Sequence, residues 1–295
     1  MKSAGIALRG VWAAVLTPID HRLEPNAPAA IPYYRDLLRN GCDGLNVLGT
    51  NGEANSFGVG QRSRFMEAIA QSKIPLERVM VGTGTTSLDD TAQLTRKAFE
   101  CGFTTALVMP PFFYRGIGDE GVVGYFHALA ARTNPPDRGF VLYNWPAVSG
   151  VTFGAALVDR LVRELPGKIA GIKDSSNDVE LQQAIGAQHA DLAIFPSSEE
   201  CLSAADVNGL AGCISGSVAL WPQLAKSVYK SGEAALADRL ARLRQAIAGP
   251  NMILRVRYLT GRALGDAAWE RAMPPLGTLS AAEKRDLEEA ISRCA

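Results

Sequence analysis

The sequence predicts a closed (β/α)₈ barrel, the TIM-barrel class, with a C-terminal helical extension, on three observations. Short β-rich runs alternate with longer segments of helical periodicity. The runs are almost continuously apolar, as expected of parallel strands that are covered on both faces. There are eight of them, which favours a closed barrel over an open doubly wound sheet. We assign residues 1–225 to the barrel and 226–295 to the extension, which should form one structural unit with it.

The strands and helices are expected to alternate along the whole barrel, with parallel strands joined by right-handed crossovers. In residues 87–102, for example, Ser87 can cap a helix and Gly102 can end it. The expected strands are, in order, residues 10–18, 44–50, 79–84, 105–111, 139–146, 169–175, 192–198 and 212–217. Further helices are expected at 60–73 and 152–165 and, after the last strand, at 221–230, 234–249 and 280–294.

Composition excludes several classes of protein. The chain has 295 residues, 47% of them hydrophobic, with 30 basic and 30 acidic side chains. Balanced charge without a basic run argues against nucleic acid or a membrane surface as a partner. The apolar part of residues 1–12 is too short for a secretory signal, and no apolar stretch approaches the roughly 18 residues of a membrane span. We therefore expect a cytoplasmic protein.

The cysteines and histidines do not form a metal site or a disulfide framework in the sequence. The three histidines stand apart, and the five cysteines are scattered without close pairs. We interpret the cysteines as small buried thiols in a reducing compartment. These residues are His21, His127, His189, Cys42, Cys101, Cys201, Cys213 and Cys294.

Polar side chains stand where several predicted strands end. Thr50 and Asn51 follow the second strand, Tyr143 lies near the end of the fifth, and Lys173 lies near the end of the sixth. In a (β/α)₈ barrel these ends form the mouth in which active sites are built. A lysine in an otherwise apolar strand is the most unusual of these residues.

Alternation along the sixth strand predicts how Lys173 is oriented. It places Lys173 on the same face as Ile169 and Gly171, with Ala170 and Ile172 on the other face. If the first face points inward, Gly171 leaves space below the lysine. Neighbouring strands lie about 4.8 Å apart, so the lysine and the tyrosine of the fifth strand should reach the same mouth.

A buried lysine at this place has a catalytic and a structural interpretation. Burial disfavours the charged form of an amine, and a neutral amine can attack a carbonyl carbon to give a Schiff base. Tyr143 and Thr50 could relay protons while the carbinolamine forms and loses water. Alternatively Lys173 could pair with Asp174, although the next residue on a strand should point to the opposite face. We favour catalysis, because perturbed ionisable groups cluster at functional sites.

Other motifs are weaker. The segment "GTGTTS" at 82–87 lacks the third glycine of a dinucleotide-binding loop. The segment "GTNGE" at 49–53 is no P-loop, but its backbone amides could hold a carboxylate. Glu53 could be a general acid or a turn residue that binds backbone amides. Trp145 could line the pocket or simply pack beside it.

Three motifs carry a resemblance to a known family. They are "GTNGE" after strand two, "YNWPAVSG" at strand five and "GIKDSS" at strand six. In this order and at these separations they resemble the family of dihydrodipicolinate synthase and N-acetylneuraminate lyase, over almost the whole chain. The resemblance implies a class I aldolase without a cofactor, in which a lysine forms a Schiff base with pyruvate or another 2-oxo acid. It also implies a homotetramer, a dimer of dimers.

The resemblance implies roles for individual residues by position. Lys173 matches the Schiff-base lysine, Tyr143 the tyrosine that shuttles protons, and Thr50 the hydroxyl beside it. Asn51, with its backbone amide, is expected to help bind the carboxylate of the 2-oxo acid. The other residues expected to bind substrate are Gly52, Tyr114, Val148, Ser197 and Ile214.

Two departures from the family pattern bear on the substrate. Synthases that act on aspartate semialdehyde typically have an arginine where this chain has Val148, and valine cannot make that bidentate contact with a carboxylate. Its loss should cost at least a few kcal/mol of binding. Phe113 stands where many members have a tyrosine that reaches a neighbouring subunit's site, and Tyr114 follows it. Arg115 is either a contact for an anionic substrate or an exposed loop residue.

The sequence therefore predicts a Schiff-base lyase that cleaves a 4-hydroxy-2-oxo acid into pyruvate and an aldehyde, or forms it from them. We prefer a 2-oxo-3-deoxy sugar acid as the substrate. The alternatives are dihydrodipicolinate synthesis from pyruvate and aspartate semialdehyde, dehydration of a deoxy sugar acid, and an aromatic hydratase-aldolase. An alternative of another class is a non-catalytic 2-oxo acid binding or regulatory protein.

Overall fold

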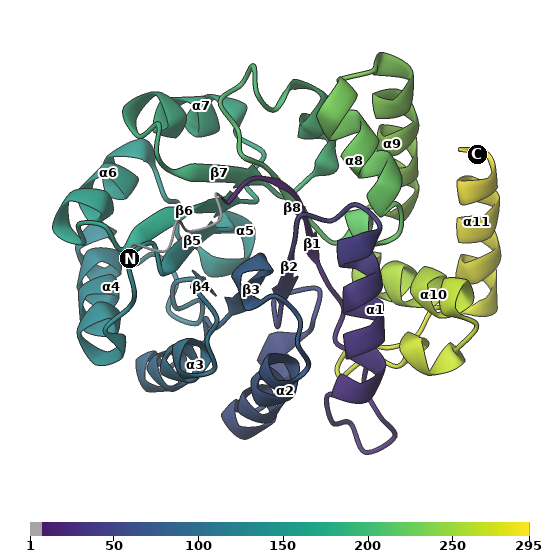
Figure 1. The fold of residues 1–295 in the computed structure, drawn as a ribbon, viewed down its shortest axis with the longest axis horizontal. Helices are drawn as coiled ribbons and strands as arrows, with labels where there is room; N and C mark the ends of the chain where they lie inside the picture. Colours follow the sequence, from purple (N-terminus) through teal and green to yellow (C-terminus); the bar gives the residue numbers. More distant parts are fainter. Residues whose placement is uncertain (1–7, 295) are drawn as a thin grey trace.

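Eight parallel strands form a ring at the centre of the structure, and helices surround it (Figure 1). The computed structural model describes residues 8–294; residues 1–7, which contribute to the expectation about a secretory signal, and residue 295 lie outside the described residues. Round the ring the order is β7-β6-β5-β4-β3-β2-β1-β8. The strands are β1 Gly10–Ala14, β2 Gly44–Val47, β3 Val79–Gly82, β4 Thr105–Val108, β5 Phe140–Asn144, β6 Ile169–Asp174, β7 Ala193–Pro196 and β8 Gly212–Ser215.

The barrel closes between β7 and β8. The amide of Ala211, directly before β8, donates a hydrogen bond to the carbonyl oxygen of Ile194 in β7 at 2.8 Å. This confirms the predicted (β/α)₈ class, and every strand lies within its predicted range. The ranges extend too far at their C-terminal ends, because buried apolar residues continue into the loops. Val15 and Leu16, for instance, are as buried as β1 but lie beyond it.

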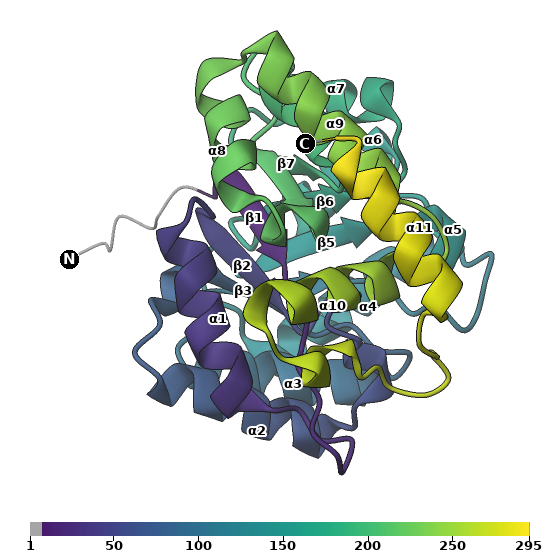
Figure 2. The ribbon, with the colours of Figure 1, turned by 90° about the vertical axis from the view of Figure 1, so that its right-hand side faces the viewer.

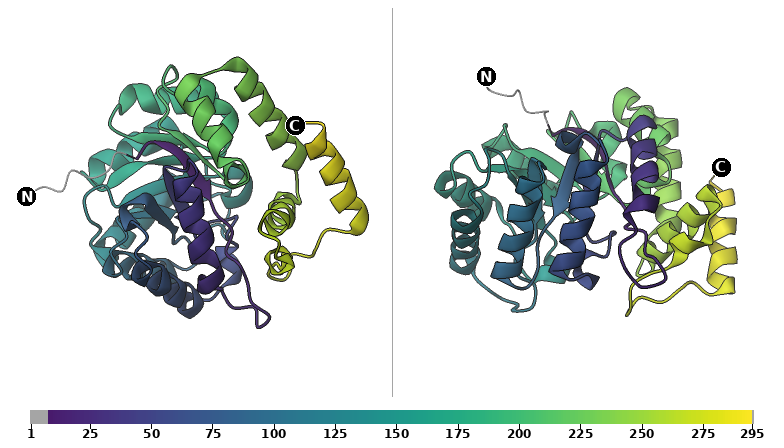
Figure 3. Two further views of the ribbon diagram at one scale, coloured as in Figure 1. Left: turned by 45° about the vertical axis from the view of Figure 1, so that its right-hand side comes forward. Right: turned by 60° about the horizontal axis from the view of Figure 1, so that its bottom comes forward.

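The helices follow the strands, and the last three α-helices of the chain lie together on one side of the barrel (Figures 1 and 3). The α-helices are α1 Ala27–Arg39, α2 Val59–Gln71, α3 Leu88–Glu100, α4 Asp119–Thr133, α5 Pro146–Ser149, α6 Ala155–Glu164, α7 Val179–Gln188, α8 Pro222–Ser231, α9 Ala234–Ile247, α10 Met252–Leu264 and α11 Ala281–Ser292. The 3₁₀ helices are η1 Ala54–Ser56, η2 Leu76–Arg78, η3 Glu199–Ala204, η4 Ser217–Ala219 and η5 Ala267–Glu270.

The local signals of α3 act as predicted. The hydroxyl of Ser87 accepts a hydrogen bond from the amide of Asp90 at 3.2 Å, which satisfies one of the free donors of the first turn. Gly102 follows the helix with φ +94°, a conformation that favours glycine.

Helix α10, between α9 and α11 along the chain, was not predicted from the sequence; it lies at the front in Figure 2. Its apolar stripe is interrupted by Arg255, Arg257 and Arg262 and by Gly261, so its periodicity is weak. Arg257 is nevertheless completely buried. The helix is stabilised by tertiary contacts of this arginine, described below, rather than by an apolar face alone.

The predicted alternation of β6 is wrong over part of the strand. Ala170 lies at a shift in register with β5 and packs with the apolar side chains inside the barrel. Ile169 and Ile172 both pack outside, under the helices. Ile169 therefore does not share the face of Lys173, because a bulge adds one residue to the strand.

Gly171 does not leave open space below the lysine. A Cβ atom there would lie 2.1 Å from the carbonyl oxygen of Ala193 in β7. The glycine instead allows β6 and β7 to approach each other closely. Below the mouth, apolar side chains that include Trp12, Met80 and Phe195 fill the barrel. The lysine thus stands on a packed floor and not over a pore.

The five cysteines are free thiols in the structure. Burial raises the pKa of both Cys42 and Cys201 to about 12, and raises that of Cys213 well above its usual value. The thiolate, which is the reactive form, is therefore scarce at pH 8. Within residues 8–294 no helix has the length and apolar character needed to cross a bilayer.

We expect iodoacetamide at pH 8 to alkylate Cys42 and Cys213, which are 1% and 0% exposed, at least about a thousandfold more slowly in the native protein than in urea, because burial suppresses the thiolate and blocks access. Peptide mass spectrometry of both samples measures the rates. Rapid native labelling of Cys42 or Cys213 would contradict their buried positions.

Candidate active site

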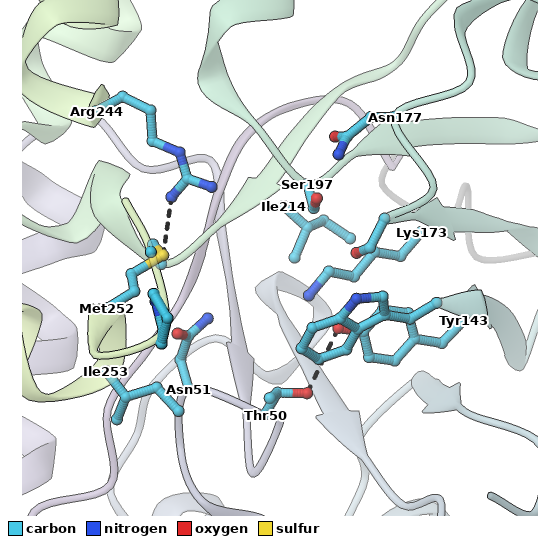
Figure 4. A pocket seen from close by; sticks show the side chains of 15 residues that line it. Thr50, Asn51, Tyr143, Lys173, Asn177, Ser197, Ile214, Arg244, Met252 and Ile253 are labelled. Atoms are coloured by element: carbon cyan, nitrogen blue, oxygen red, sulfur yellow. Dashed lines mark hydrogen bonds between the residues drawn. The ribbon is translucent and has the colours of Figure 1, made fainter. Parts of the chain in front are cut away.

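A cavity of about 380 Å³ opens at the mouth of the barrel, at the C-terminal ends of the strands (Figure 4). One side is formed by residues that end or follow β2, β5, β6, β7 and β8, and the other by α9, α10 and their connection. The lining residues are Thr50, Asn51, Tyr143, Trp145, Lys173, Ser175, Asn177, Ser197, Ile214, Gly216, Arg244, Gly249, Pro250, Met252 and Ile253. Its size suits a small metabolite.

Lys173 lies in this cavity and is only 2% exposed. It is paired in register with Tyr143 on the neighbouring strand, and its Nζ atom lies 4.5 Å from the centre of the tyrosine ring. Within the described chain Lys173 forms no ion pair with a carboxylate. Its amine is therefore available to a substrate.

Asp174 points away from the cavity and is satisfied by neutral donors. Its carboxylate accepts hydrogen bonds from Asn144 Nδ2 and Gln182 Nε2, each at 2.6 Å, and from the hydroxyl of Ser176 at 2.8 Å. The structural interpretation, in which Asp174 pairs with Lys173, is therefore wrong. The carboxylate instead fixes the end of β6 to β5 and α7.

Tyr143 is 5% exposed and contacts three other lining residues, Lys173, Thr50 and Trp145. Its hydroxyl is 3.4 Å from Thr50 Oγ1, and its ring stacks on Trp145 with centroids 6.1 Å apart. Trp145 thus both packs and lines the cavity. The contact with the threonine connects two hydroxyls in a line that can pass protons.

We expect Tyr143→Phe to lower kcat for cleavage of the substrate by about 10²- to 10⁴-fold, because it removes the proton donor and acceptor but keeps the ring on Lys173 and Trp145. Steady-state kinetics measures the loss. Tyr125→Phe is a matched control, because its hydroxyl is buried without a hydrogen-bond partner in the described residues. Similar kcat values for Tyr143→Phe and the wild type would contradict a proton-transfer role.

Three other predicted site residues also line the cavity. Asn51 packs against Gly216, where a Cβ atom would lie 2.7 Å from the asparagine Nδ2. Glycine at 216 is therefore what leaves room for Asn51. Ser197 and Ile214 complete this side, at the ends of β7 and β8.

Gly52, Tyr114 and Val148 do not line this cavity. Gly52 is enclosed behind it, where a Cβ atom would lie 2.9 Å from Thr17 Oγ1. Tyr114 is 71% exposed on the loop after β4 and packs edge-on against Phe113, which is 74% exposed. Val148 packs against the apolar cluster of the barrel interior.

Arg115 remains an exposed loop residue and lies outside the lining of the cavity. Its Nη2 donates a hydrogen bond to the carbonyl oxygen of Val148 at 3.4 Å. The guanidinium is thus beside the position where the synthase pattern has an arginine, without replacing it in the cavity.

Glu53 also lies outside the cavity, and its carboxylate is fully used elsewhere. Arg257 Nε donates to Glu53 Oε1 at 2.5 Å, and the amide of Met273 donates to Oε2 at 2.7 Å. Arg257 also donates to the carbonyl oxygens of Thr17 and Trp269. Glu53 therefore binds α10 and the following segment to the turn that carries Thr50, and is not a general acid.

The residues that sequence reasoning missed come mainly from outside the strand ends. Arg244 lies near the end of α9, and Met252 and Ile253 begin α10. The expectation that the site is formed by polar residues at strand ends could not identify these three residues, because they lie on helices. Ser175 and Asn177, by contrast, directly follow β6, and that expectation could have identified them.

No group of three or more potential metal-binding side chains occurs in residues 8–294. His127 and His189 lie on the outer layer, where they contact Glu164 and Asp159.

The chain is similar in sequence and structure to known proteins. The model of the dihydrodipicolinate synthetase family matches residues 7–294. The chain is 34% identical over 245 residues to an uncharacterized DapA-like lyase of Chloroflexus aurantiacus, with 81% of each protein covered. It is 29% identical over 237 residues to N-acetylneuraminate lyase of Salmonella paratyphi B, with 79% of this chain and 78% of that enzyme covered. Its structure resembles dihydrodipicolinate synthase from Agrobacterium tumefaciens, with a TM-score of 0.88, 28% identity, and 97% and 99% of the two chains covered.

Proposed function

The chain belongs to the dihydrodipicolinate synthetase family of pyruvate-dependent class I aldolases and lyases, and from this premise we propose that it cleaves a 4-hydroxy-2-oxo acid into pyruvate and an aldehyde. The substrate we propose is a 2-oxo-3-deoxy sugar acid. The observation that carries the proposal is the buried amine of Lys173, which has no carboxylate partner among the described residues and opens into the cavity beside Tyr143.

The proposed reaction begins when Lys173 Nζ attacks the C2 carbonyl carbon of the 2-oxo acid. The carbinolamine then loses its hydroxyl group as water, with the proton supplied by the Tyr143 hydroxyl, and the resulting iminium ion withdraws electrons from the C3–C4 bond. The Tyr143 oxygen accepts the proton of the C4 hydroxyl as that bond breaks, the aldehyde leaves, and an enamine remains. Protonation of the enamine at C3 and hydrolysis then release pyruvate and restore the lysine. Thr50 holds the tyrosine hydroxyl in place.

The carboxylate of the 2-oxo acid is proposed to bind at the turn that follows β2. Thr50 and Asn51 line the cavity there, and a turn of this kind presents backbone amides to an anion. The buried ion pair of Glu53 and Arg257 supports this role, because it holds the turn in one position.

Val148 supports a lyase over a synthase that uses aspartate semialdehyde. It is apolar, packs against the barrel interior, and offers no donor to the carboxylate of a second substrate. The similarity to N-acetylneuraminate lyase agrees with this preference, whereas the structural similarity to a dihydrodipicolinate synthase keeps synthesis as the second candidate.

The test is to incubate the protein with a panel of 2-oxo-3-deoxy sugar acids and measure pyruvate release, and in parallel to measure the consumption of aspartate semialdehyde with pyruvate. We expect turnover of at least one sugar acid, and little of the semialdehyde. Rapid use of aspartate semialdehyde would replace the proposed reaction by the second candidate. A protein that traps 2-oxo acids on Lys173 but turns over no substrate would be a binding protein.

We also propose that the protein is a cytoplasmic homotetramer. Phe113 and Tyr114 are largely exposed and pack edge-on against each other, and this exposed aromatic pair supports a subunit contact at the loop after β4. Analytical ultracentrifugation measures the mass; a monomer at micromolar concentration would contradict this assembly.

A further inference from the structure

The cavity contains two basic side chains and no acidic one among residues 8–294. Lys173 and Arg244 are its basic lining residues, and the lining contains no aspartate or glutamate. The two side chains lie on opposite sides of the cavity, Lys173 on the strand side and Arg244 on the side of α9 (Figure 4). A 2-oxo acid bound to Lys173 has its own carboxylate at the β2 turn, as proposed above. Arg244 is then a cationic site at the far end of the cavity.

The guanidinium of Arg244 has unused donors. Its Nη1 atom donates to Ser217 Oγ and contacts Met252 Sδ, each at 3.1 Å. Within residues 8–294 its Nε and Nη2 atoms donate no hydrogen bond, and Arg244 forms no ion pair. The edge formed by Nε and one Nη atom matches the two oxygens of a carboxylate.

A chain of hydrogen bonds below the cavity holds Arg244 in this position. The hydroxyl of Ser215 donates to Glu199 Oε2 at 2.6 Å and lies 3.0 Å from Ser217 Oγ. Each hydroxyl has one proton. Since that of Ser215 goes to the carboxylate, Ser215 accepts from Ser217, and Ser217 in turn accepts from Arg244.

Glu199 is the buried end of this chain. It is 0% exposed, and its Oε1 atom has no hydrogen-bond partner in the described residues. A buried carboxylate without an adjacent cation is rare, because removing it from water is costly. Its carboxyl group is connected to the guanidinium through the hydroxyls of Ser215 and Ser217, and these hydrogen bonds hold Arg244 in position.

We propose that Arg244 binds a carboxylate at the end of the substrate remote from the 2-oxo group, so that the preferred substrates are 2-oxo diacids. Ser215, Ser217 and Glu199 are positioning residues for it. This inference rests on the proposed function and narrows it: among 2-oxo-3-deoxy sugar acids, those with a second, terminal carboxylate are preferred.

The inference is tested without turnover, by borohydride trapping of 2-oxo acids on Lys173. We compare 2-oxo diacids of five to seven carbons with 2-oxo monoacids of the same lengths, and measure by mass spectrometry the concentration that gives half-maximal trapping. We expect the best diacid to be trapped at about 10- to 100-fold lower concentration than its monoacid. Arg244→Gln should abolish this preference, and Arg244→Lys should restore only part of it, because lysine lacks the bidentate edge.

Arg242→Gln is the matched control. Arg242 lies on the same helix and pairs with Asp238 in solvent, so this variant makes the same change of charge outside the cavity. It should keep the wild-type preference. Equal trapping of diacids and monoacids by the wild type overturns the inference but leaves the proposed function intact. A preference that persists in Arg244→Gln, or an equal loss of monoacid affinity in that variant, also overturns it. Failure to trap any 2-oxo acid overturns the proposed function itself.

The positioning role has its own readout. Ser217→Ala removes the acceptor of Arg244 Nη1, so we expect the half-maximal concentration to rise several-fold for the diacid and not for the monoacid. A general structural effect of Ser217→Ala would weaken both ligands equally, and this result would remove Ser217 from the proposal.

Discussion

Lys173→Met is expected to abolish Schiff-base formation and to lower kcat by at least about 10³-fold, because no other amine of residues 8–294 lines the cavity. Borohydride reduction with pyruvate, followed by peptide mass spectrometry, should place one adduct on Lys173 of the wild-type protein and none on the variant. Pyruvate formation from a substrate measures the loss of activity.

The variant should remain folded. Methionine is similar in length and apolar, and Lys173 has no carboxylate partner in residues 8–294 that would be left unpaired. The midpoint of urea unfolding should therefore not fall, which separates a chemical role from a structural one. Lys168→Met is the matched control, since Lys168 lies directly before β6 and pairs with Asp137 at the surface. A pyruvate adduct on Lys173→Met, or none on the wild type with any 2-oxo acid, would refute the mechanism.

Glu53→Gln is expected to lower the free energy of unfolding by about 3–5 kcal/mol. Glu53 and Arg257 are both buried, and the variant leaves the guanidinium without its counter-charge in a site that water does not reach. Chemical denaturation with urea measures the change. It should also weaken binding of 2-oxo acids, because the pair attaches α10 to the turn that carries Thr50 and Asn51.

The pair of Glu24 and Arg64 offers the matched control. Its side chains are largely in solvent, at 43% and 65% exposure, so Glu24→Gln should cost no more than about 1 kcal/mol. Replacing both Glu53 and Arg257 by uncharged residues should be less damaging than the sum of the two single changes, because no unpaired charge remains. A loss below 1 kcal/mol for Glu53→Gln would contradict the role of this pair.

Sequence periodicity was sufficient for the barrel and for most of its helices, because each element carries its own local signal. A helix such as α3 has a cap at Ser87, an apolar stripe and a terminating glycine, and all three can be recognised without knowledge of its neighbours. Periodicity failed at Ala170, where a bulge inserts one residue into β6. Nothing local distinguishes a bulged strand from a regular one of the same composition.

For the candidate site, the strand-end rule worked where the strands themselves supply the side chains. It brought together Tyr143 and Lys173, which lie on β5 and β6, and Thr50, which lies in the turn after β2. It could not identify Arg244, because Arg244 lies on α9, a helix that follows the barrel strands. By residue number it is more than 70 positions from Lys173. Only the packing of that helix brings the guanidinium to the cavity.

The sequence by itself determined the repeating strand-helix order, the position of the lysine at the end of the sixth strand, and the family to which the chain belongs. All three depend on residue type and spacing along the chain. The tertiary structure decided which charges meet. It pairs Glu53 with Arg257, 204 positions apart. It surrounds the carboxylate of Asp174 with neutral hydrogen-bond donors and not with the amine of Lys173. It also places Arg244 across the cavity from Lys173. The physical reason is that the electrostatics of a buried group depend on neighbours within a few ångströms, and those neighbours come from segments that are distant in sequence.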